Sequence, residues 1–475
     1  MMLRRQNLHR FQSLALAQTS RTLSQTPRYV HQSARQNVSV PASSSVSTSQ
    51  LLSTQPESQI AQSKAVLGRL PTSAVLRSYL ITAMSSQPIL LNACFGLLRR
   101  MLDSKSFLMS IERNPVLSNL LKKTFYAQFC VGEHKDEVVK NTDFARTLGY
   151  GGILFEYALE VLGGEAPSAE ETKMEIEVWR KGMLQSVDMA REGDFVGLKW
   201  SGLGRHALNL LQNQQDATPE MWDAITAACD AAAAKGVSLL PGAEEEATNL
   251  GLEKWTLALQ KKYNRPEQGR AVLYITYQCY LRDISKRMAQ HLEKASKEGY
   301  IAGVKLVRGA YLTSEPKHLT FDTKAGTDAN YDACADAVVR QQWTDKVPAP
   351  TPGTPFPKVN IVLATHNLAS VQAAQKIRAS QMLSTSPENL PRLTYAQLQG
   401  MADEISQALV QDETMKADTQ SKVVKCMTWG TTTECLNFLL RRASENKEAA
   451  LRTEDTRKAM GKELWRRLRV VFGLA

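Results

Sequence analysis

Residues 423–446 read VVKCMTWGTTTECLNFLLRRASEN, which predicts a strand, a turn and a helix in succession. The apolar run Val423–Trp429 is typical of a buried strand, and Gly430 follows it as a turn residue. Thr431 and Glu434 have the S/T-x-x-E spacing of a capping box, so we expect a helix to begin there. Apolar side chains then recur at helical spacing and give this helix one apolar face. The stretch is therefore one strand–helix unit.

The same unit recurs along the chain, because short apolar runs alternate with stretches long enough to form a helix. Near-continuous apolar strands that alternate with helices indicate a parallel sheet, and eight such units predict an α/β fold, a (β/α)8 barrel. We expect a distorted barrel with an N-terminal helical arm and a C-terminal helix over the barrel mouth. An open doubly wound sheet is the alternative, but it would normally show a G-x-G-x-x-G turn after an early strand. The predicted strands are Tyr150–Phe155, Phe195–Trp200, Val237–Leu240, Val272–Gln278, Gly303–Arg308, Val359–Thr365, Leu393–Leu398 and Val423–Trp429.

The N-terminal segment differs from the rest of the chain in charge. Residues 1–56 hold six arginines and no acidic residue, and they are rich in Ser, Thr and Gln. The formal net charge of the chain is +11, whereas the residues after 56 carry 52 Lys+Arg against 47 Asp+Glu, a balance of +5. Such a leader is typical of a mitochondrial transit peptide, with a disordered basic tail as the alternative. We expect a disordered transit peptide over residues 1–60, the helical arm over 61–147 and the barrel over 148–475.

Several other classes of site are disfavoured by composition. The mixed charge beyond the leader and the lack of a basic aromatic motif argue against nucleic-acid binding. The seven cysteines are scattered without a C-x-x-C pair, which argues against a disulfide framework or a zinc site. No two histidines beyond the leader have metal-ligand spacing. We therefore predict no metal site.

The stretch Ser78–Leu98 contains no charged residue and is long enough to span a bilayer. Pro88 and several Ser, Thr, Gln and Asn residues interrupt it. We expect buried or membrane-touching helices here rather than a true span.

Polar residues stand at the carboxyl ends of the predicted strands, where barrel enzymes place their reactive groups. Lys199, Gln278, Lys305, Arg308 and His366 lie at or near these ends. Together they predict a net-cationic pocket with amide donors, suited to a carboxylated or phosphorylated ligand. No nucleophile–base arrangement stands out, so a redox cofactor would have to supply the difficult chemistry. Each of these residues taken alone has a structural alternative, as a satisfied polar group at the edge of the core.

Two adjacent arginines, Arg441 and Arg442, lie on the last predicted helix. Neighbouring helical residues project about 100° apart, so the two guanidinium groups form a fork suited to a planar anion. Glu445 lies four residues after Arg441 and can pair with it. A solvated charged face is the alternative interpretation.

These segments resemble the proline dehydrogenase family of mitochondrial flavoenzymes. The motif Phe-Leu-Leu-Arg-Arg-x-x-Glu-Asn at 438–446 is similar to the family's C-terminal signature, and Val-Lys-Leu-Val-Arg-Gly-Ala-Tyr at 304–311 is similar to a strand beside the flavin. Family motifs occur in order from about residue 110 to 465. The resemblance implies a substrate pocket and catalytic site formed by Lys199, Tyr311, Leu398, Arg441, Arg442 and Glu445. It implies an FAD site formed by Gln278, Lys305, Gly309, Ala310, Lys324, Thr327, Thr365, His366 and Asn367.

The resemblance also implies an activity and a place in the cell. Members oxidise L-proline to Δ1-pyrroline-5-carboxylate, the first step of proline catabolism, and pass the electrons to ubiquinone. We therefore expect an FAD-dependent enzyme on the matrix side of the inner mitochondrial membrane, in peripheral contact with that membrane. Two alternatives stay open: a flavin-binding paralogue with weak or lost turnover that acts as a sensor or interaction protein, and an oxidase of another cyclic amino acid.

Two positions depart from the family pattern. The second strand of the family usually reads Val-Asp-Ala-Glu, whereas this chain has Pro241-Gly242-Ala243-Glu244. The last strand usually carries a tyrosine where this chain has Cys426. Both changes lie at the substrate end of the implied site, so we expect a normally bound flavin and weak proline turnover.

Overall fold

The computed structural model describes residues 65–104, 106–159, 161, 164–445 and 453–473. The predicted transit peptide, residues 1–60, lies outside the described residues. The predicted boundary between arm and barrel at residue 147 stays a prediction.

The eight predicted strands all form. They are β2 (Gly152–Tyr157), β3 (Phe195–Leu198), β4 (Ser238–Pro241), β5 (Ile275–Gln278), β6 (Ala302–Val307), β7 (Val359–Ala364), β8 (Leu393–Leu398) and β9 (Ser421–Trp429). They pair in parallel in the order β4-β3-β2-β9-β8-β7-β6-β5, and a short strand, β1 (Cys130–Gly132), pairs with β9 beside this path.

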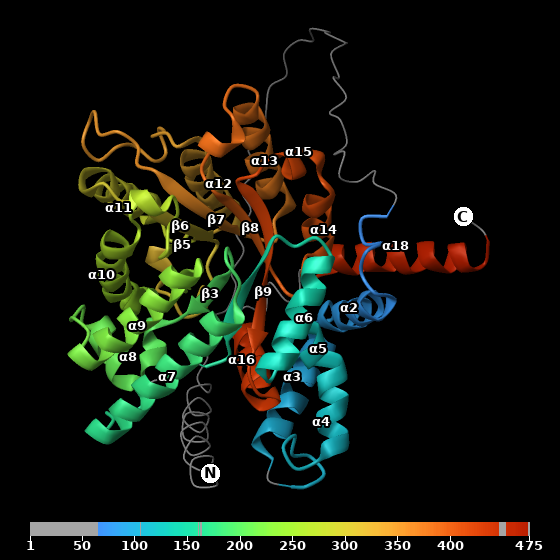
Figure 1. Cartoon of the computed structure of the whole chain (residues 1–475). Coiled ribbons are helices and arrows are strands. Elements are labelled where there is room, and N and C mark those ends of the chain that lie inside the picture. The colour runs from blue at the N-terminus through green and yellow to red at the C-terminus, as the bar shows by residue number, and fades with distance from the viewer. Residues whose placement is uncertain (1–64, 105, 160, 162–163, 446–452, 474–475) are drawn as a thin grey trace, which may run out of the picture. The chain divides into compact units, whose positions relative to one another are not determined.

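The two end strands of this order also meet. The Leu239 amide donates to the Val272 carbonyl at 2.7 Å, and the Tyr274 amide donates to the Leu239 carbonyl at 3.0 Å. The sheet is therefore a nearly closed barrel, as predicted, rather than an open sheet (Figure 1).

Helices follow the strands, and local sequence fixes where several begin and end. Ser168 and Glu171 form a capping box at the start of α7, and Thr218 and Pro219 start α9. The helices after β2 are α7 (Ala169–Met189), α8 (Arg205–Gln212), α9 (Pro219–Lys235), α10 (Glu246–Tyr263), α11 (Ile284–Glu298), α12 (Lys324–Arg340), α13 (Leu368–Met382), α14 (Asp403–Gln411), α15 (Glu413–Ala417), α16 (Thr432–Glu445) and α18 (Glu454–Val471). Short 3-10 turns are η3 (Trp200–Leu203), η4 (Pro266–Gln268), η5 (Lys317–Leu319) and η6 (Pro387–Asn389).

The inside of the barrel is filled by one apolar cluster with members on most of the strands. Leu154 of β2, Phe195 of β3, Leu240 of β4 and Val424 of β9 are all buried in it. Side chains two residues apart on a strand face the same way. The residues two positions further along these strands therefore face the interior at the carboxyl end of the barrel, which we call the mouth.

The N-terminal arm is helical, as predicted. It consists of α2 (Thr72–Ser85), α3 (Pro88–Asp103), α4 (Pro115–Leu121), the π-helical turn η2 (Lys122–Tyr126), α5 (Ala127–Phe129) and α6 (Lys135–Thr147). Among the described residues, no single helix is long and apolar enough to cross a membrane; α2 and α3 pass that test only as a pair bent by 104°.

The C-terminal helix α18 packs against α2 of the arm (Figure 1). Val75 of α2 and Met460 of α18 are buried in one cluster, and Arg467 donates to the carbonyls of Leu67 and Leu70 at 3.0 and 2.8 Å. The helix that reaches the mouth is instead α16, through Arg442.

Candidate active site

The helix α16 starts where the sequence predicted. The Thr431 amide donates to Glu434 Oε2 at 2.9 Å, and the Glu434 amide donates to Thr431 Oγ1 at 3.3 Å, so the capping box is formed. Glu133, next to β1, accepts from the Thr432 amide at 2.7 Å. These bonds satisfy amides at the first turn of the helix and fix its direction as it leaves β9.

Three predicted substrate residues meet at one phenol. Lys199 Nζ and Arg442 Nη1 each donate to Tyr311 Oη at 3.1 Å, and the Tyr311 hydroxyl lies 3.5 Å from the Ala243 carbonyl that it donates to. The lysine follows β3, the tyrosine follows β6 and the arginine lies on α16. Two cations from distant parts of the sequence therefore converge at the mouth, as an anion-binding site requires.

The other predicted substrate residues are less fully placed. Leu398 ends β8 with its side chain 48% exposed and pairs in register with Cys426 of β9. Arg441 is half-buried beside Arg442 on α16. The side chain of Glu445 lies outside the described residues, so its predicted pairing with Arg441 stays a prediction.

A second polar cluster gathers around Arg308, at the end of β6. Its guanidinium donates to Asp328 at 2.6 Å, to Thr365 Oγ1 at 2.7 Å and to Ser370 Oγ at 2.9 Å. Lys324 donates to the same aspartate. Burial raises the pKa of Asp328, but hydrogen bonds from Lys324 and Arg308 outweigh it and hold this pKa below its ordinary value.

Most of the predicted FAD residues lie in or beside this cluster. Thr327 is half-buried on the first turn of α12, next to Asp328. The Asn367 side chain accepts from the Ser370 amide at 3.2 Å and caps α13. His366 Nε2 accepts from the Leu398 amide at 3.2 Å, which requires that nitrogen to be unprotonated.

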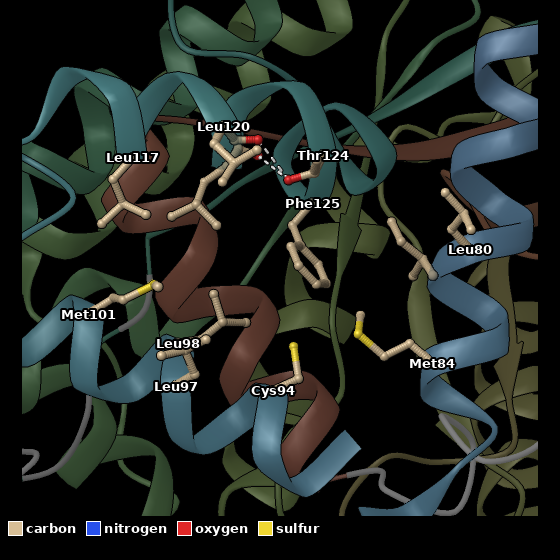
Figure 2. A pocket seen from close by; sticks show the side chains of 12 residues that line it. Leu80, Met84, Cys94, Leu97, Leu98, Met101, Leu117, Leu120, Thr124 and Phe125 are labelled. Atoms are coloured by element: carbon tan, nitrogen blue, oxygen red, sulfur yellow. Dashed lines mark hydrogen bonds between the residues drawn. The ribbon is translucent and has the colours of Figure 1, made fainter. Parts of the chain in front are cut away.

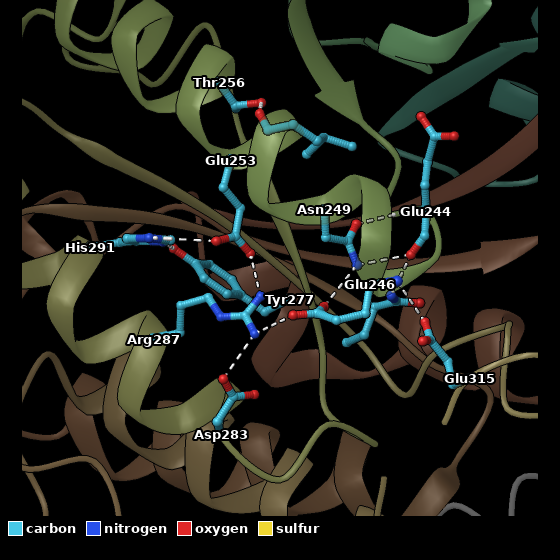
Figure 3. A network of polar contacts seen from close by, with 12 residues as sticks. Glu244, Glu246, Asn249, Glu253, Thr256, Tyr277, Asp283, Arg287, His291 and Glu315 are labelled. Atoms are coloured by element: carbon cyan, nitrogen blue, oxygen red, sulfur yellow. Dashed lines mark hydrogen bonds and ion pairs between the residues drawn. The ribbon is translucent and has the colours of Figure 1, made fainter. Parts of the chain in front are cut away.

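Gln278, at the end of β5, is buried and forms hydrogen bonds with residues of two loops. Its Nε2 donates to the Glu244 carbonyl at 2.8 Å, and its Oε1 accepts from the Tyr280 hydroxyl at 3.2 Å. Asn249 of α10 exchanges two hydrogen bonds with the Glu244 backbone, at 2.9 and 2.8 Å (Figure 3). The loop after β4, which carries Gly242 and Ala243, is therefore held firmly beneath Tyr311.

Lys305 lies on β6 between residues that pack outward, so its side chain faces the mouth. Gly309 and Ala310 follow the same strand. Gly309 has φ 121°, and a Cβ there would lie 1.7 Å from the ring of Tyr280. Only glycine fits this position.

A charged network stands behind the loop after β4. Arg287 of α11 contacts Glu246 at 2.5 Å, Glu253 at 3.0 Å and Asp283 at 2.9 Å, and His291 lies 3.8 Å from Glu253 (Figure 3). Burial raises the pKa of Glu253 to about 7 although Arg287 lowers it, and burial together with Arg287 lowers the pKa of His291 to about 4. The network joins the start of α10 to α11.

Comparison with known proteins agrees with this geometry. The family described as proline dehydrogenase matches residues 140–455. The chain belongs to the proline dehydrogenase family. The match begins just before β2 and ends beyond α16, so it includes the whole barrel and both polar clusters.

Relatives within the family are distant. The probable mitochondrial proline dehydrogenase of Schizosaccharomyces pombe is 28% identical over 451 residues, which is 83% of this chain and 88% of that protein. The mouse hydroxyproline dehydrogenase is 32% identical over 245 residues, 50% of this chain and 49% of that protein. The crystal structure of proline utilization A from Bdellovibrio bacteriovorus has a TM-score of 0.58 at 18% identity and covers 82% of this chain. The chain spans 41% of that longer protein, and the likeness shows the shared fold.

Two residues of these clusters had no role predicted from the sequence. The sequence predicts Arg308 at the mouth. Its role as the centre of the second cluster depends on partners that only the fold brings together. Glu156 of β2 was missed altogether. Its inward direction follows from the buried Leu154 two residues before it, and this alternation was the signal that could have found it.

Proposed function

We propose that this chain oxidises L-proline to Δ1-pyrroline-5-carboxylate at the barrel mouth, with the carboxylate of proline bound by Arg442, Lys199 and Arg441. Membership of the family gives the reaction, and the chain is a flavin oxidoreductase. The observation that carries the residue assignment is the convergence of Lys199 and Arg442 on Tyr311, at 3.1 Å each.

The residues of the proposed substrate site play different parts. Arg442 and Arg441 supply guanidinium groups that bind the carboxylate, and Lys199 adds a third cation. Tyr311 accepts from Lys199 and Arg442, which orients both before substrate arrives. Leu398, exposed at the end of β8, offers an apolar contact for the pyrrolidine ring. These residues bind and orient; the ring nitrogen loses a proton as the C5–H bond breaks.

FAD is the flavin that the second cluster fits best. Arg308 and Lys324 supply cations, Thr365 supplies a hydroxyl, and the helices α12 and α13 begin at this cluster. Cations and helix amino termini are the groups that bind a diphosphate. Lys305 of β6 and Gln278 at the end of β5 lie on neighbouring strands, and we assign both to the flavin side of the site. A bound FAD would supply the acceptor for the hydride that leaves C5 of proline.

We also propose that the arm contacts a membrane, from which a quinone takes the electrons. An apolar pocket of about 360 Å³ opens between α2, α3 and α4, lined by leucine, methionine and phenylalanine side chains (Figure 2). Large apolar residues of α3 and α4 are also exposed, Ile89 by 84% and Val116 by 78%. Residues 65–126 hold eight Lys+Arg against two Asp+Glu, a charge that complements anionic lipid.

The leader supports a mitochondrial location. A fusion of residues 1–60 to a fluorescent reporter is expected to enter mitochondria, and a cytosolic reporter would contradict this part of the proposal.

Flavin reduction by a panel of cyclic amino acids tests the proposed activity. Under anaerobic conditions, L-proline is expected to bleach the flavin faster than D-proline, hydroxyproline or pipecolate. A protein that holds flavin but is not bleached by any of them would favour the paralogue that has lost turnover. Faster bleaching by another cyclic amino acid would favour the third alternative.

A further inference from the structure

We propose that Glu156 sets the charge selectivity of the mouth, so that the site binds an amino acid, which carries an ammonium group, in preference to a plain carboxylate of the same size. The inference rests on the proposed function, because it takes Lys199 and Arg442 as the groups that bind the substrate carboxylate. It adds a specificity-determining residue that lies outside the arginine fork and outside the motifs quoted in the sequence analysis.

The position of Glu156 follows from the pairing of three strands. Leu154 and Val424 are buried inside the barrel, and Glu156 lies two residues beyond Leu154 on β2, so it faces the interior at the mouth. It pairs in register with Gly197 of β3 and with Thr428 of β9. Its carboxyl group is therefore part of the wall from which Lys199 projects.

Gly197 makes room for this carboxyl group. A Cβ on Gly197 would lie 1.9 Å from Glu156 Oε2 and 3.0 Å from its Cδ, so any other residue at 197 would collide with the side chain. The carboxyl group thus lies across β3, in the direction of Lys199. Glu156, Lys199 and Phe438 line one small cavity, and Phe438 is on the helix that carries Arg442.

The charged and titratable groups that face Glu156 come from four elements. Lys199 follows β3, Lys305 lies on β6, Arg442 lies on α16, and the Cys426 thiol lies on β9. Burial raises the pKa of Glu156, and the charges of Lys305, Lys199 and Arg442 oppose that rise. Burial and then Glu156 raise the pKa of Cys426 to about 12, so the thiol is neutral and adds no charge. Three cations therefore face one carboxyl group.

Gly242 explains why the negative charge beside these cations comes from Glu156 in this chain. The family pattern puts an aspartate at this place. A Cβ on Gly242 would lie 3.5 Å from the Leu198 carbonyl oxygen and 3.9 Å from Lys199 Cγ, which is ordinary contact. A Cβ would therefore fit beside Lys199, but glycine leaves that place without a charge. Glu156, on the next strand but one, supplies the negative charge instead.

The consequence is a difference between two kinds of ligand. The carboxylate of any ligand is attracted by the cations and repelled by ionised Glu156, whereas the ammonium group of an amino acid is attracted by Glu156. At a separation of about 6 Å and an effective dielectric constant of about 20, one unit charge changes an affinity by about 100-fold. An effect of about tenfold or more is therefore expected on the ratio of the two affinities.

The test uses a pair of ring compounds that differ by one ammonium group, cyclopentanecarboxylate and 1-aminocyclopentane-1-carboxylate. Their dissociation constants are measured by calorimetry on the FAD-loaded full chain, so turnover is not needed. In Glu156→Gln we expect the ratio to shift toward the plain acid by about tenfold or more. Adding Gly242→Asp to that variant returns a carboxylate to the side of Lys199 and is expected to restore part of the ratio. Glu388→Gln, an exposed residue far from the mouth, is the control.

A second measurement needs no variant. Burial raises the pKa of Glu156, so its ionised fraction grows as the pH rises through that raised pKa, and the preference of the natural protein for the amino acid is expected to rise with it. Glu156→Gln could instead weaken the affinity for both ligands by the same factor, and the ratio of the two dissociation constants in the natural protein could be independent of pH. These two results together would show that Glu156 has a purely structural role and would overturn the inference. If neither ligand binds and proline does not reduce the flavin, the proposed function itself is wrong.

Discussion

At the scale of single residues, Tyr311 is the group on which the substrate end depends. Its hydroxyl accepts from Lys199 and Arg442 at 3.1 Å each. Two cations held to one acceptor keep a fixed separation, and a fixed separation is what a carboxylate with two oxygens needs.

Removal of this hydroxyl is the first prediction. In Tyr311→Phe, both cations lose a shared acceptor, so the affinity for a ring carboxylic acid is expected to fall by about tenfold, with flavin content unchanged. Tyr395→Phe is the matched control, because its buried hydroxyl has no hydrogen-bond partner among the described residues. Ligand affinity is measured by calorimetry. If Tyr311→Phe and Tyr395→Phe change it equally, Tyr311 does not belong to the substrate site.

Gly309 gives a second prediction at this scale. A methyl group there would lie 1.7 Å from the Tyr280 ring, at a φ that favours glycine. Gly309→Ala is therefore expected to cost at least about 2 kcal/mol of unfolding free energy and to lower flavin content. Gly299→Ala, with φ 71° and no atom within 4 Å, separates the collision from the backbone strain. Stability is measured by urea unfolding. If the curves of Gly309→Ala and Gly299→Ala coincide, the collision with Tyr280 does not destabilise the protein.

At the scale of elements, strands were easier to predict than the links between them. The runs at Val359–Thr365 and Val423–Trp429 are almost continuously apolar, because strands of a barrel are covered on both faces. The capping box at Thr431 marked the start of α16 correctly. By contrast, Glu156 lies one residue beyond the predicted run Tyr150–Phe155, although β2 includes it, and it gave no signal of its own. Glu156 is functional only because β3 and β9 place Lys199 and Cys426 beside it.

The network between α10 and α11 predicts how stability depends on pH. The pKa of Glu253 is raised on folding from 4.5 to about 7, so its contribution to stability is complete below about pH 4.5 and is lost as the pH rises through 7. His291 acts in the other direction, because its pKa falls from 6.5 to about 4 and its contribution is lost as the pH drops through that range.

Glu253→Gln isolates the first of these effects. The natural protein is expected to lose up to about 3 kcal/mol of unfolding free energy through this group between pH 5 and pH 8, and the variant is expected to lose much less. Glu388→Gln, which is exposed, is expected to keep the natural slope. Urea unfolding at several pH values checks this, and parallel slopes in all three proteins would exclude Glu253 as the cause.

At the scale of the whole molecule, the exposed apolar surface is concentrated away from the barrel. Ile89, Leu97 and Val116 of the arm are exposed, and so are Trp465 and Val471 of α18. The sequence indicated that residues 78–98 touch a membrane or are buried, but it could not show that α18 packs on α2. Arg467 and Leu67 meet across 400 residues, and no local pattern reports a contact at that separation.

The arm surface yields a prediction about membranes. Ile89→Ser with Leu90→Ser removes two exposed apolar side chains, 84% and 51% exposed, and is expected to lower binding to anionic phospholipid vesicles by about tenfold or more. Leu383→Ser with Leu312→Ser changes two exposed leucines outside the arm, 90% and 39% exposed, and is expected to have little effect. Binding is measured by co-sedimentation with the vesicles. If it falls equally in both double variants, the arm is not the part of the protein that contacts the membrane.

The most direct test of the central claim is anaerobic flavin reduction by L-proline in the natural chain and in Arg442→Met. We expect proline to bleach the flavin of the natural chain. We expect Arg442→Met to keep its flavin but to need at least about tenfold more proline for the same rate, because the substrate carboxylate loses its guanidinium partner. Arg340→Met changes a surface arginine of α12 that pairs with Asp336 and should bleach like the natural protein. Bleaching at the same proline concentrations in Arg442→Met and the natural chain would contradict the account.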